Sequence, residues 1–245
     1  MLLYAARGIE RWPAGREWLD LTLIALLLLV VGNGTLTWSE QWVPAGIASL
    51  VIAATPFWMV LFARLAGEKV PSRSVLGLSV GFLGMLVLLW PDIRAFAPGS
   101  SFTRGVLLLF LATGGWAYGS IHAKRRQPKA DAVLTIALQQ LVGGACLGVL
   151  GLLRGEAALW APTSVGWAAI AYLAVFGTIV GYSAYIYSLE HLPTDLVSVY
   201  AYVNPVVAVL LGVLLLGERF DLYLACGMPL VLWGIYLVKG ERVAR

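Results

Sequence analysis

Eight long apolar segments constrain this chain more than any other feature of its sequence. Each can cross the ~30 Å hydrocarbon layer of a bilayer, which takes about 20 helical residues. They occupy residues 19–39, 46–66, 74–90, 104–122, 131–153, 166–187, 196–216 and 222–239. Backbone polar groups need internal partners in lipid, and the sequence lacks the two-residue alternation of a membrane barrel, so these segments are predicted to be helices. The predicted fold is an all-α polytopic membrane protein.

Composition excludes several other classes. The chain is 60% hydrophobic and only 12% charged, whereas soluble domains are about 25% charged. Both cysteines, Cys146 and Cys226, lie inside apolar segments, which leaves no disulfide framework and no CxxC metal site. Residues 1–6 are too short for the apolar region of a secretion signal. We expect no metal, no cofactor and no catalytic residue.

The basic residues predict the orientation. If the segments cross alternately, 13 of the 17 Lys and Arg residues fall on one side and 4 on the other. The basic side holds Arg7, Arg11, Arg16, Arg64, Lys69, Arg73, Lys124, Arg125, Arg126, Lys129, Lys239, Arg242 and Arg245. By the positive-inside rule this side, with the C-terminus, is predicted to be cytoplasmic in a cell inner membrane. The net charge of +4 therefore reports orientation and does not indicate a nucleic-acid partner.

The sequence repeats itself at an offset of about 150 residues. Matched pairs include Glu40 and Glu190, Gly77 and Gly227, Gly84 and Gly234, and, with a one-residue slip, Pro44 and Pro193, and Pro56 and Pro205. The segments beginning at 19 and 166 correspond, so one repeat contains five crossings and must insert upside down relative to the other. Inverted repeats of this kind are common in secondary transporters.

The repeat divides the chain at residues 1–98 and 99–245 in a five-plus-five arrangement. By this count the first repeat lacks its first helix and most of its second. About eight full helices are therefore expected, with residues 1–7 as the end of helix 2.

Two stretches resemble a known family: GNGTLTWSEQWVPAGIASLVIAATPFWMVLFARLAGE at 32–68 and YAYVNPVVAVLLGVLLLGE at 200–218. They are similar to the EamA family of the drug/metabolite transporter superfamily, particularly its bacterial YedA-like permeases. The resemblance covers residues 17–239. It implies a ten-helix inner-membrane carrier with a central cavity between its halves, which exports or exchanges amino acids and related metabolites. The chain departs from this pattern in helices 1 and 2.

Polar and aromatic residues within the segments predict a substrate site. Asn33, Thr37 and Glu40 share one helix face, and a polar stripe in lipid should face the bundle interior or a wet cavity. Glu40 and Glu190 lie at segment ends, where we favour a structural role. The predicted lining residues are Asn33, Thr55, Trp116, Tyr182, Tyr202 and Asn204.

Prolines occur at matching places in the middle of two segments, at Pro56 and Pro205. A proline removes one amide donor and frees a carbonyl, so it can open a helix towards a substrate. The alternative is a simple kink satisfied by a neighbouring helix.

Other candidates are less specific. His122, at the basic end of a segment, is more typical of an interfacial residue than of a proton relay. The GxxxG pairs are typical of close helix packing.

The preferred function is movement of a small neutral or zwitterionic metabolite by alternating access. No Asp, Glu, Lys or Arg lies near the centre of any segment, whereas ion-driven carriers commonly bury such a group there. Alternatives are a proton-coupled drug exporter and a membrane subunit or fragment that needs a partner chain. The expected partners are the lipid bilayer and a small solute, with a homodimer left open. An enzyme or a channel is disfavoured because no HExxH, charged ring or carbonyl filter is visible.

Overall fold

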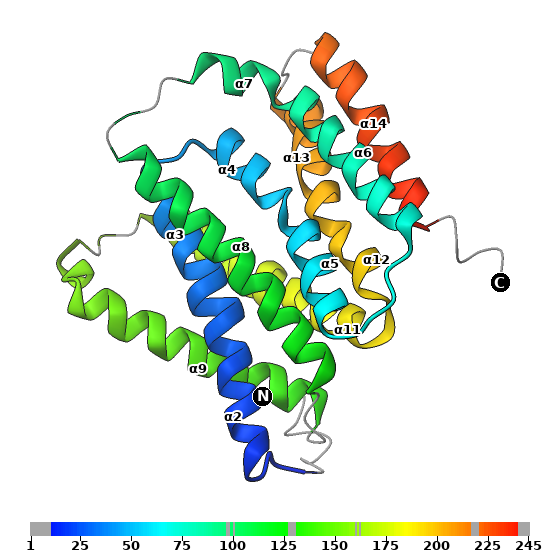
Figure 1. The fold of residues 1–245 in the computed structure, drawn as a ribbon. Coiled ribbons are helices and arrows are strands. Elements are labelled where there is room, and N and C mark those ends of the chain that lie inside the picture. Colours follow the sequence, from blue (N-terminus) through cyan, green and yellow to red (C-terminus); the bar gives the residue numbers. More distant parts are fainter. Residues whose placement is uncertain are drawn as a thin grey trace.

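The protein is an all-α bundle (Figure 1). The computed structural model describes residues 11–96, 99, 101–126, 131–159, 161, 163–216 and 221–239. Six of its helical stretches are long and apolar enough to span a membrane, and α6, at 17 residues, is a shorter apolar helix. Each of the eight expected segments is occupied by helix, which confirms the polytopic all-α class. The helix end expected at residues 1–7 lies outside the described residues.

The first half of the chain contains three helical segments. The first runs without interruption through α2 (Arg16–Ala25), the π-helical η1 (Leu26–Gly34) and α3 (Thr35–Ser39). The second is broken into α4 (Ala45–Ile52) and α5 (Thr55–Leu65). The third is α6 (Ser72–Leu88), followed by the short α7 (Trp90–Ala95).

The second half contains five helical segments. They are α8 (Phe102–Arg125), α9 (Ala132–Leu153), the continuous run of α10 (Ser164–Tyr172), π-helical η3 (Leu173–Tyr182) and α11 (Ser183–His191), the pair α12 (Thr194–Ser198) and α13 (Tyr200–Leu216), and α14 (Leu222–Lys239). A short 3-10 turn, η2 (Glu156–Leu159), follows α9. The π-helical segments η1 and η3 occupy similar places in the two copies of the repeat. Such segments are rare and are frequently found at functional sites.

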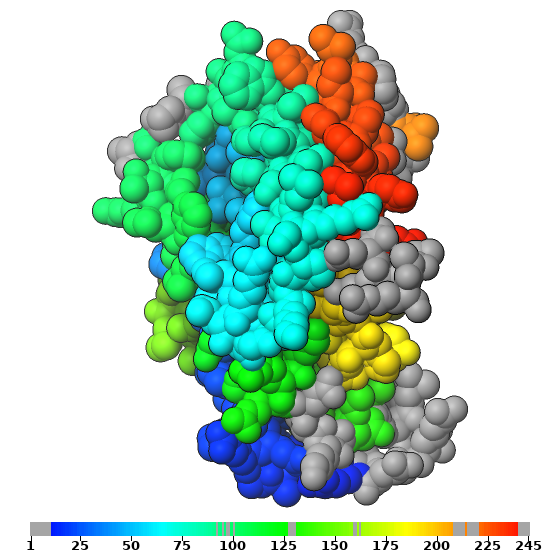
Figure 2. All heavy atoms as spheres, turned by 45° about the vertical axis from the view of Figure 1, so that its right-hand side comes forward, coloured from blue at the N-terminus to red at the C-terminus, as the bar shows by residue number. Residues whose placement is uncertain are grey.

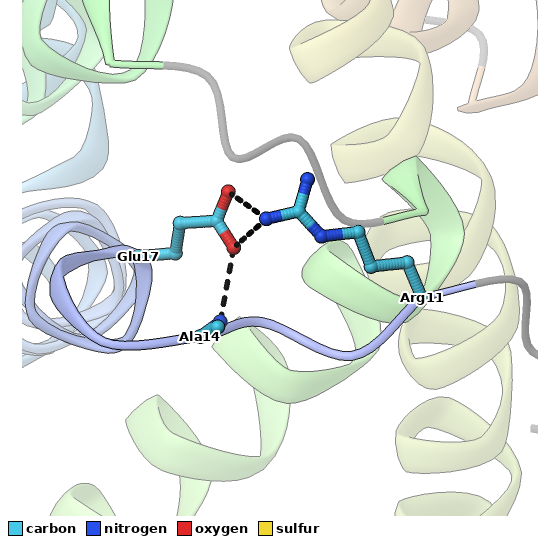
Figure 3. Close-up of polar contacts among 3 residues, drawn as sticks. All are labelled: Arg11, Ala14 and Glu17. Atoms are coloured by element: carbon cyan, nitrogen blue, oxygen red, sulfur yellow. Dashed lines mark hydrogen bonds and ion pairs between the residues drawn. The ribbon is translucent and has the colours of Figure 1, made fainter.

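Local interactions define the start of α2 (Figure 3). The backbone amide of Ala14 donates to Oε2 of Glu17 over 3.0 Å, and a nitrogen of the Arg11 guanidinium lies 3.4 Å from both oxygens of the same carboxylate. An acidic side chain in the first turn satisfies a free amide and interacts favourably with the helix dipole. Glu17 thereby holds Arg11 at the start of the bundle.

The helices α6 and α14 pack closely through glycines that match one another in the sequence comparison. A Cβ on Gly77 would lie 2.7 Å from the carbonyl oxygen of Gly234, and a Cβ on Gly84 would lie 3.0 Å from that of Gly227. The sequence comparison pairs Gly77 with Gly227 and Gly84 with Gly234. In the structure the contacts are crossed, because Gly77 meets Gly234 and Gly84 meets Gly227. The helices run antiparallel, side by side (Figure 1). This reciprocal pattern is expected for two segments related by a two-fold axis.

The other GxxxG pairs divide into two groups. Gly115 and Gly119 of α8 pack against η1, as expected for close helix approach. A Cβ on Gly144 or Gly148 of α9 would meet nothing within 4 Å, so at these positions the predicted packing role is wrong. The motif therefore marks a helix interface only where the glycines face a neighbour.

One crossing is largely uncovered. No residue of α10 is buried, and Tyr182 is the only buried residue of η3 in the described part of the chain. Large apolar side chains on this surface include Tyr172, which is 61% exposed, and Ile179, which is 62% exposed. By contrast, η1 is packed against both α8 and α9. The two similar π-helical segments therefore have different surroundings.

Candidate functional site

Two cavities meet at four residues in the interior of the bundle. The larger has a volume of about 740 Å³ and the smaller about 280 Å³, and Asn33, Trp116, Tyr200 and Asn204 line both. Asn33 comes from η1 in the first repeat, whereas Trp116 lies on α8 and the other two on α13 in the second. The side chains of both asparagines are exposed to this space. The segments η1 and α13 thus supply one amide each to a common lining.

The larger cavity extends towards η3 and α11. Its additional polar lining residues are Gln140, Thr178, Tyr182, Tyr185 and Ser188. Its volume lies within the roughly 300–1,000 Å³ range of small-molecule sites. None of its described lining residues is Asp, Glu, Lys or Arg, and the same holds for the smaller cavity. The lining can therefore offer hydrogen bonds and aromatic faces to a solute, but no fixed side-chain charge.

A hydrogen-bonded group orients the indole of Trp116. Its Nε1 donates to the hydroxyl oxygen of Tyr185 over 2.9 Å, and that hydroxyl also lies 2.6 Å from Oγ of Ser120. The ring centroids of Trp116 and Tyr185 are 5.2 Å apart, and Tyr200 packs edge-on against Tyr185 at the same spacing. A side chain held by several partners presents one surface to a ligand with little loss of conformational freedom. This aromatic wall joins α8, α11 and α13.

The proline positions differ from the expectation. Pro56 lies in the first turn of α5, where a missing amide is tolerated, and the helix break falls before it at Ala53 and Ala54. Pro205 lies inside α13, and the corresponding break falls at Val199, between α12 and α13. Neither proline lines either cavity. The prediction of matched helix breaks at the two prolines is therefore wrong. The helices are interrupted at Ala53 and Ala54 and at Val199, which do not correspond in the sequence repeat.

Thr55 and Ile52 show what the first break does for the site. Both line the smaller cavity, on either side of the interruption between α4 and α5. Pro56 cannot donate to the carbonyl of Ile52, its partner four residues earlier. The break thus brings the end of α4 and the start of α5 to the cavity wall. The Thr55 side chain itself is only 2% exposed.

The structure does not bring Tyr202 to the cavities. Its side chain is fully buried on the other side of α13, where the ring lies against Gly81 and the hydroxyl donates to the carbonyl oxygen of Leu78 over 2.8 Å. Residues two apart on an α-helix differ by about 200° in direction, so Tyr200 and Tyr202 point to opposite faces. Tyr200 and Asn204, four residues apart, share the cavity face. The lining aromatic of α13 is therefore Tyr200, and Tyr202 attaches α13 to α6.

The lining residue Gln140 was absent from the predicted set, as was its neighbour Gln139, which lines neither cavity but contacts Tyr182. Gln139 and Gln140 lie within an apolar span, where a polar side chain is costly and normally faces the bundle interior or a cavity. The sequence signal was present, since no other glutamine lies near the middle of a segment. Gln139 is 2% exposed and its Oε1 accepts from the hydroxyl of Tyr182 over 2.9 Å. Tyr182 thus reaches the edge of the cavity with its hydroxyl already occupied.

Replacing Tyr182 with phenylalanine should lower stability more than it alters solute binding. The substitution leaves the buried Oε1 of Gln139 without its donor, and an unsatisfied buried group costs about 1–3 kcal/mol. We expect a lower unfolding midpoint for the purified protein. Tyr187→Phe, on the exposed surface of α11, is the control and should leave the midpoint unchanged.

A second polar cluster connects the two repeats at the end predicted to be cytoplasmic. The hydroxyl of Thr194 donates to Oε2 of Glu68 over 2.8 Å, and the Nζ atom of Lys124 lies 2.9 Å from that hydroxyl and 3.4 Å from the same carboxylate oxygen. Beside them the Ser74 hydroxyl donates to Oδ2 of Asp195 over 2.6 Å, with both side chains buried. Glu68 and Ser74 flank the loop before α6, whereas the others belong to the second repeat. These contacts hold the loop before α6 and the start of α6 against α8 and α12.

The chain matches the EamA-like transporter family over residues 1–90 and 103–240. It is 34% identical over 230 residues to the uncharacterized inner membrane transporter YedA of Escherichia coli (strain K12), covering 94% of this chain and 73% of YedA. It is 28% identical over 214 residues to a probable amino-acid metabolite efflux pump of Salmonella typhimurium (strain LT2), covering 82% of this chain and 70% of the pump. A crystal structure with 22% identity has the same fold, with a TM-score of 0.83 over 99% of this chain and 83% of that one. The chain is therefore a member of the EamA-like transporter family, in the drug/metabolite transporter superfamily.

Proposed function

We propose that this transporter moves a small neutral or zwitterionic metabolite of amino-acid type, by export or exchange. The observation that carries the proposal is the uncharged lining to which opposed repeats contribute Asn33 and Asn204. An amide can accept from an ammonium group and donate to a carboxylate. Two such amides can bind both charged groups of a zwitterion. Because the net charge of a zwitterion is zero, the site needs no charged side chain to balance it. The name of the Salmonella relative agrees with this solute class.

We further propose that residues 1–98 and 99–245 act as the two rocking halves of an alternating-access cycle. The reciprocal glycine contacts of α6 and α14 support a two-fold relation between these units. The polar cluster around Glu68 and Asp195 closes the end predicted to be cytoplasmic, which is also the end where we place the C-terminus. Opening that end would require these hydrogen bonds to break while the glycine interface stays packed.

Asp195→Ala should therefore make the cavity easier to reach from the side predicted to be cytoplasmic. The change removes the buried acceptor of the Ser74 hydroxyl. In a Cys146→Ser/Cys226→Ser background, the Val203→Cys thiol on the cavity wall should react several-fold faster with a membrane-impermeant thiol reagent applied from that side. Glu190→Ala, on the exposed end of α11, is the control and should leave the rate unchanged.

Transport itself is tested by reconstituting the purified chain into lipid vesicles. Vesicles loaded with unlabelled neutral amino acids should take up the labelled compounds faster than empty vesicles, with and without a pH gradient. Uptake that depends entirely on the pH gradient would instead favour the proton-coupled drug exporter.

A membrane subunit that works with a partner chain is the second candidate function. It is favoured by the uncovered surface of α10 and η3, because Leu173 and Thr178 of η3 also line the larger cavity. A partner helix on this surface would close that wall. Transport that is present in membranes of expressing cells but absent from the purified chain would support this candidate over the first.

A further inference from the structure

A third cavity lies outside the central site, at the end predicted to be cytoplasmic. It has a volume of about 660 Å³ and lies where α2, α5 and α8 end or begin. We call it the basic groove; its lining residues are Arg16, Phe62, Leu65, Ala66, Tyr118, Ile121, His122, Arg125 and Arg126. Figure 2 shows α5 (cyan), the end of α8 (green) and the start of α2 (blue) following one another down this face.

The groove opens on the outer side of α8. Tyr118 and His122 are one helical turn apart and point away from Trp116, which lines the central cavities. A solute in the central cavity would therefore be separated from the groove by α8 itself. The groove belongs to the surface that the protein presents to its surroundings in the membrane.

One wall of the groove is apolar. Leu65 is 75% exposed and Tyr118 is 49% exposed. Phe62 packs edge-on against Tyr118 with a centroid distance of 5.6 Å. Apolar and aromatic side chains exposed at the end of a spanning helix are typical of contact with acyl chains at the membrane boundary.

The other wall is basic. Arg11 is held by Glu17 (Figure 3), and His122 lies 3.0 Å from Oδ1 of Asp20. Arg16, Arg125 and Arg126, by contrast, have no carboxylate partner among the residues that the structure describes. The described lining of the groove contains no Asp or Glu. Three arginines in the lining of one cavity thus have no acidic partner among the described residues.

We propose that the basic groove binds an anionic phospholipid, with its phosphate on the arginines and an acyl chain along Phe62, Leu65 and Tyr118. A guanidinium group can hold a phosphate through two parallel hydrogen bonds. Basic pockets between transmembrane helices on the cytoplasmic side are suited to anionic lipid headgroups. The apolar wall favours a lipid over a free phosphate, because a soluble anion would leave it uncovered.

The test uses the delipidated full chain in detergent and native mass spectrometry. Phosphatidylglycerol is titrated against phosphatidylcholine with the same acyl chains. Arg16→Gln/Arg125→Gln should weaken phosphatidylglycerol binding about 10- to 30-fold, since each arginine near a membrane surface contributes about 1 kcal/mol. Arg125→Lys should keep most of the affinity, because it retains the charge.

The matched control is Lys69→Gln/Arg73→Gln. It removes two exposed charges on the same predicted side, outside the groove, and should change affinity less than two-fold. Equal weakening by both double variants would reduce the groove to a general basic surface and overturn the proposal. Equal binding of phosphatidylcholine, or displacement of the lipid by glycerol phosphate, which has no acyl chain, would also overturn it. If Arg16→Gln/Arg125→Gln also lowers the unfolding midpoint, the Arg125→Lys variant decides the question. It must still bind phosphatidylglycerol, and loss of binding in that variant would overturn the proposal.

Discussion

Asn204→Ala should lower the transport rate per folded molecule about 10- to 100-fold, because a hydrogen bond to a charged group contributes about 1.5–3 kcal/mol. Asn204 lines both central cavities and is the amide that the second repeat supplies to the shared lining. Its loss removes a donor and an acceptor while leaving the helix packing in place. The measurement is initial uptake into vesicles, divided by the amount of folded protein reconstituted.

The control for this variant is Leu214→Ala on the same helix. Leu214 is 76% exposed and lies outside both cavities. Its replacement should change uptake less than two-fold. If Asn204→Ala transports as well as the unaltered protein, the shared amide lining has no part in solute binding.

Gly234→Leu should abolish stable folding or lower the free energy of unfolding by about 3 kcal/mol, at the upper end of typical overpacking effects. A Cβ at this position would lie 2.5 Å from the backbone nitrogen of Gly81 and 2.6 Å from the carbonyl oxygen of Gly77. Backbone atoms of a packed helix cannot move aside as a flexible side chain can, so α6 and α14 must separate. The measurement is the unfolding midpoint in detergent together with membrane abundance.

Gly148→Leu is the matched control, because a Cβ there would meet nothing within 4 Å. Its midpoint should stay close to that of the unaltered protein. Comparable losses in the two variants would contradict the assignment of α6 and α14 as the close interface between the repeats.

The sequence was sufficient to predict the helices because a membrane leaves few alternatives. An apolar segment of the right length must satisfy its backbone internally, so the eight segments translate directly into helix. The glycine pattern was also informative, since Gly77 and Gly84 match Gly227 and Gly234 in the repeat and meet reciprocally in the structure. These predictions depended on length and periodicity, which a single chain displays.

The site was predicted only in part, and helix direction explains the difference. Asn33, Trp116 and Asn204 lie together at the two cavities, whereas Tyr202 is buried on the far side of α13. Choosing Tyr200 required knowing that Asn204 faces the cavity and that residues four apart share its direction. Which face of a helix points inward is determined by its neighbours, and one sequence does not identify those neighbours.

The helix breaks illustrate a second limit. Proline predicts that a helix is disturbed near Pro56 and Pro205, yet the interruptions fall at Ala53 and Ala54 and at Val199. Proline is tolerated in the first turn of a helix, so the chain can place the break before it. The position of a break depends on the packing of the short helices on either side, which the local sequence does not specify.

The most direct test of the central claim is exchange of labelled neutral amino acids by vesicles that contain the purified chain. Vesicles that contain the protein and are loaded with unlabelled amino acid should take up more labelled amino acid than vesicles without protein. This uptake should fall at least ten-fold with Asn204→Ala. Uptake equal to that of empty vesicles, in the presence and absence of a pH gradient and in native membranes as well as vesicles, would contradict the claim.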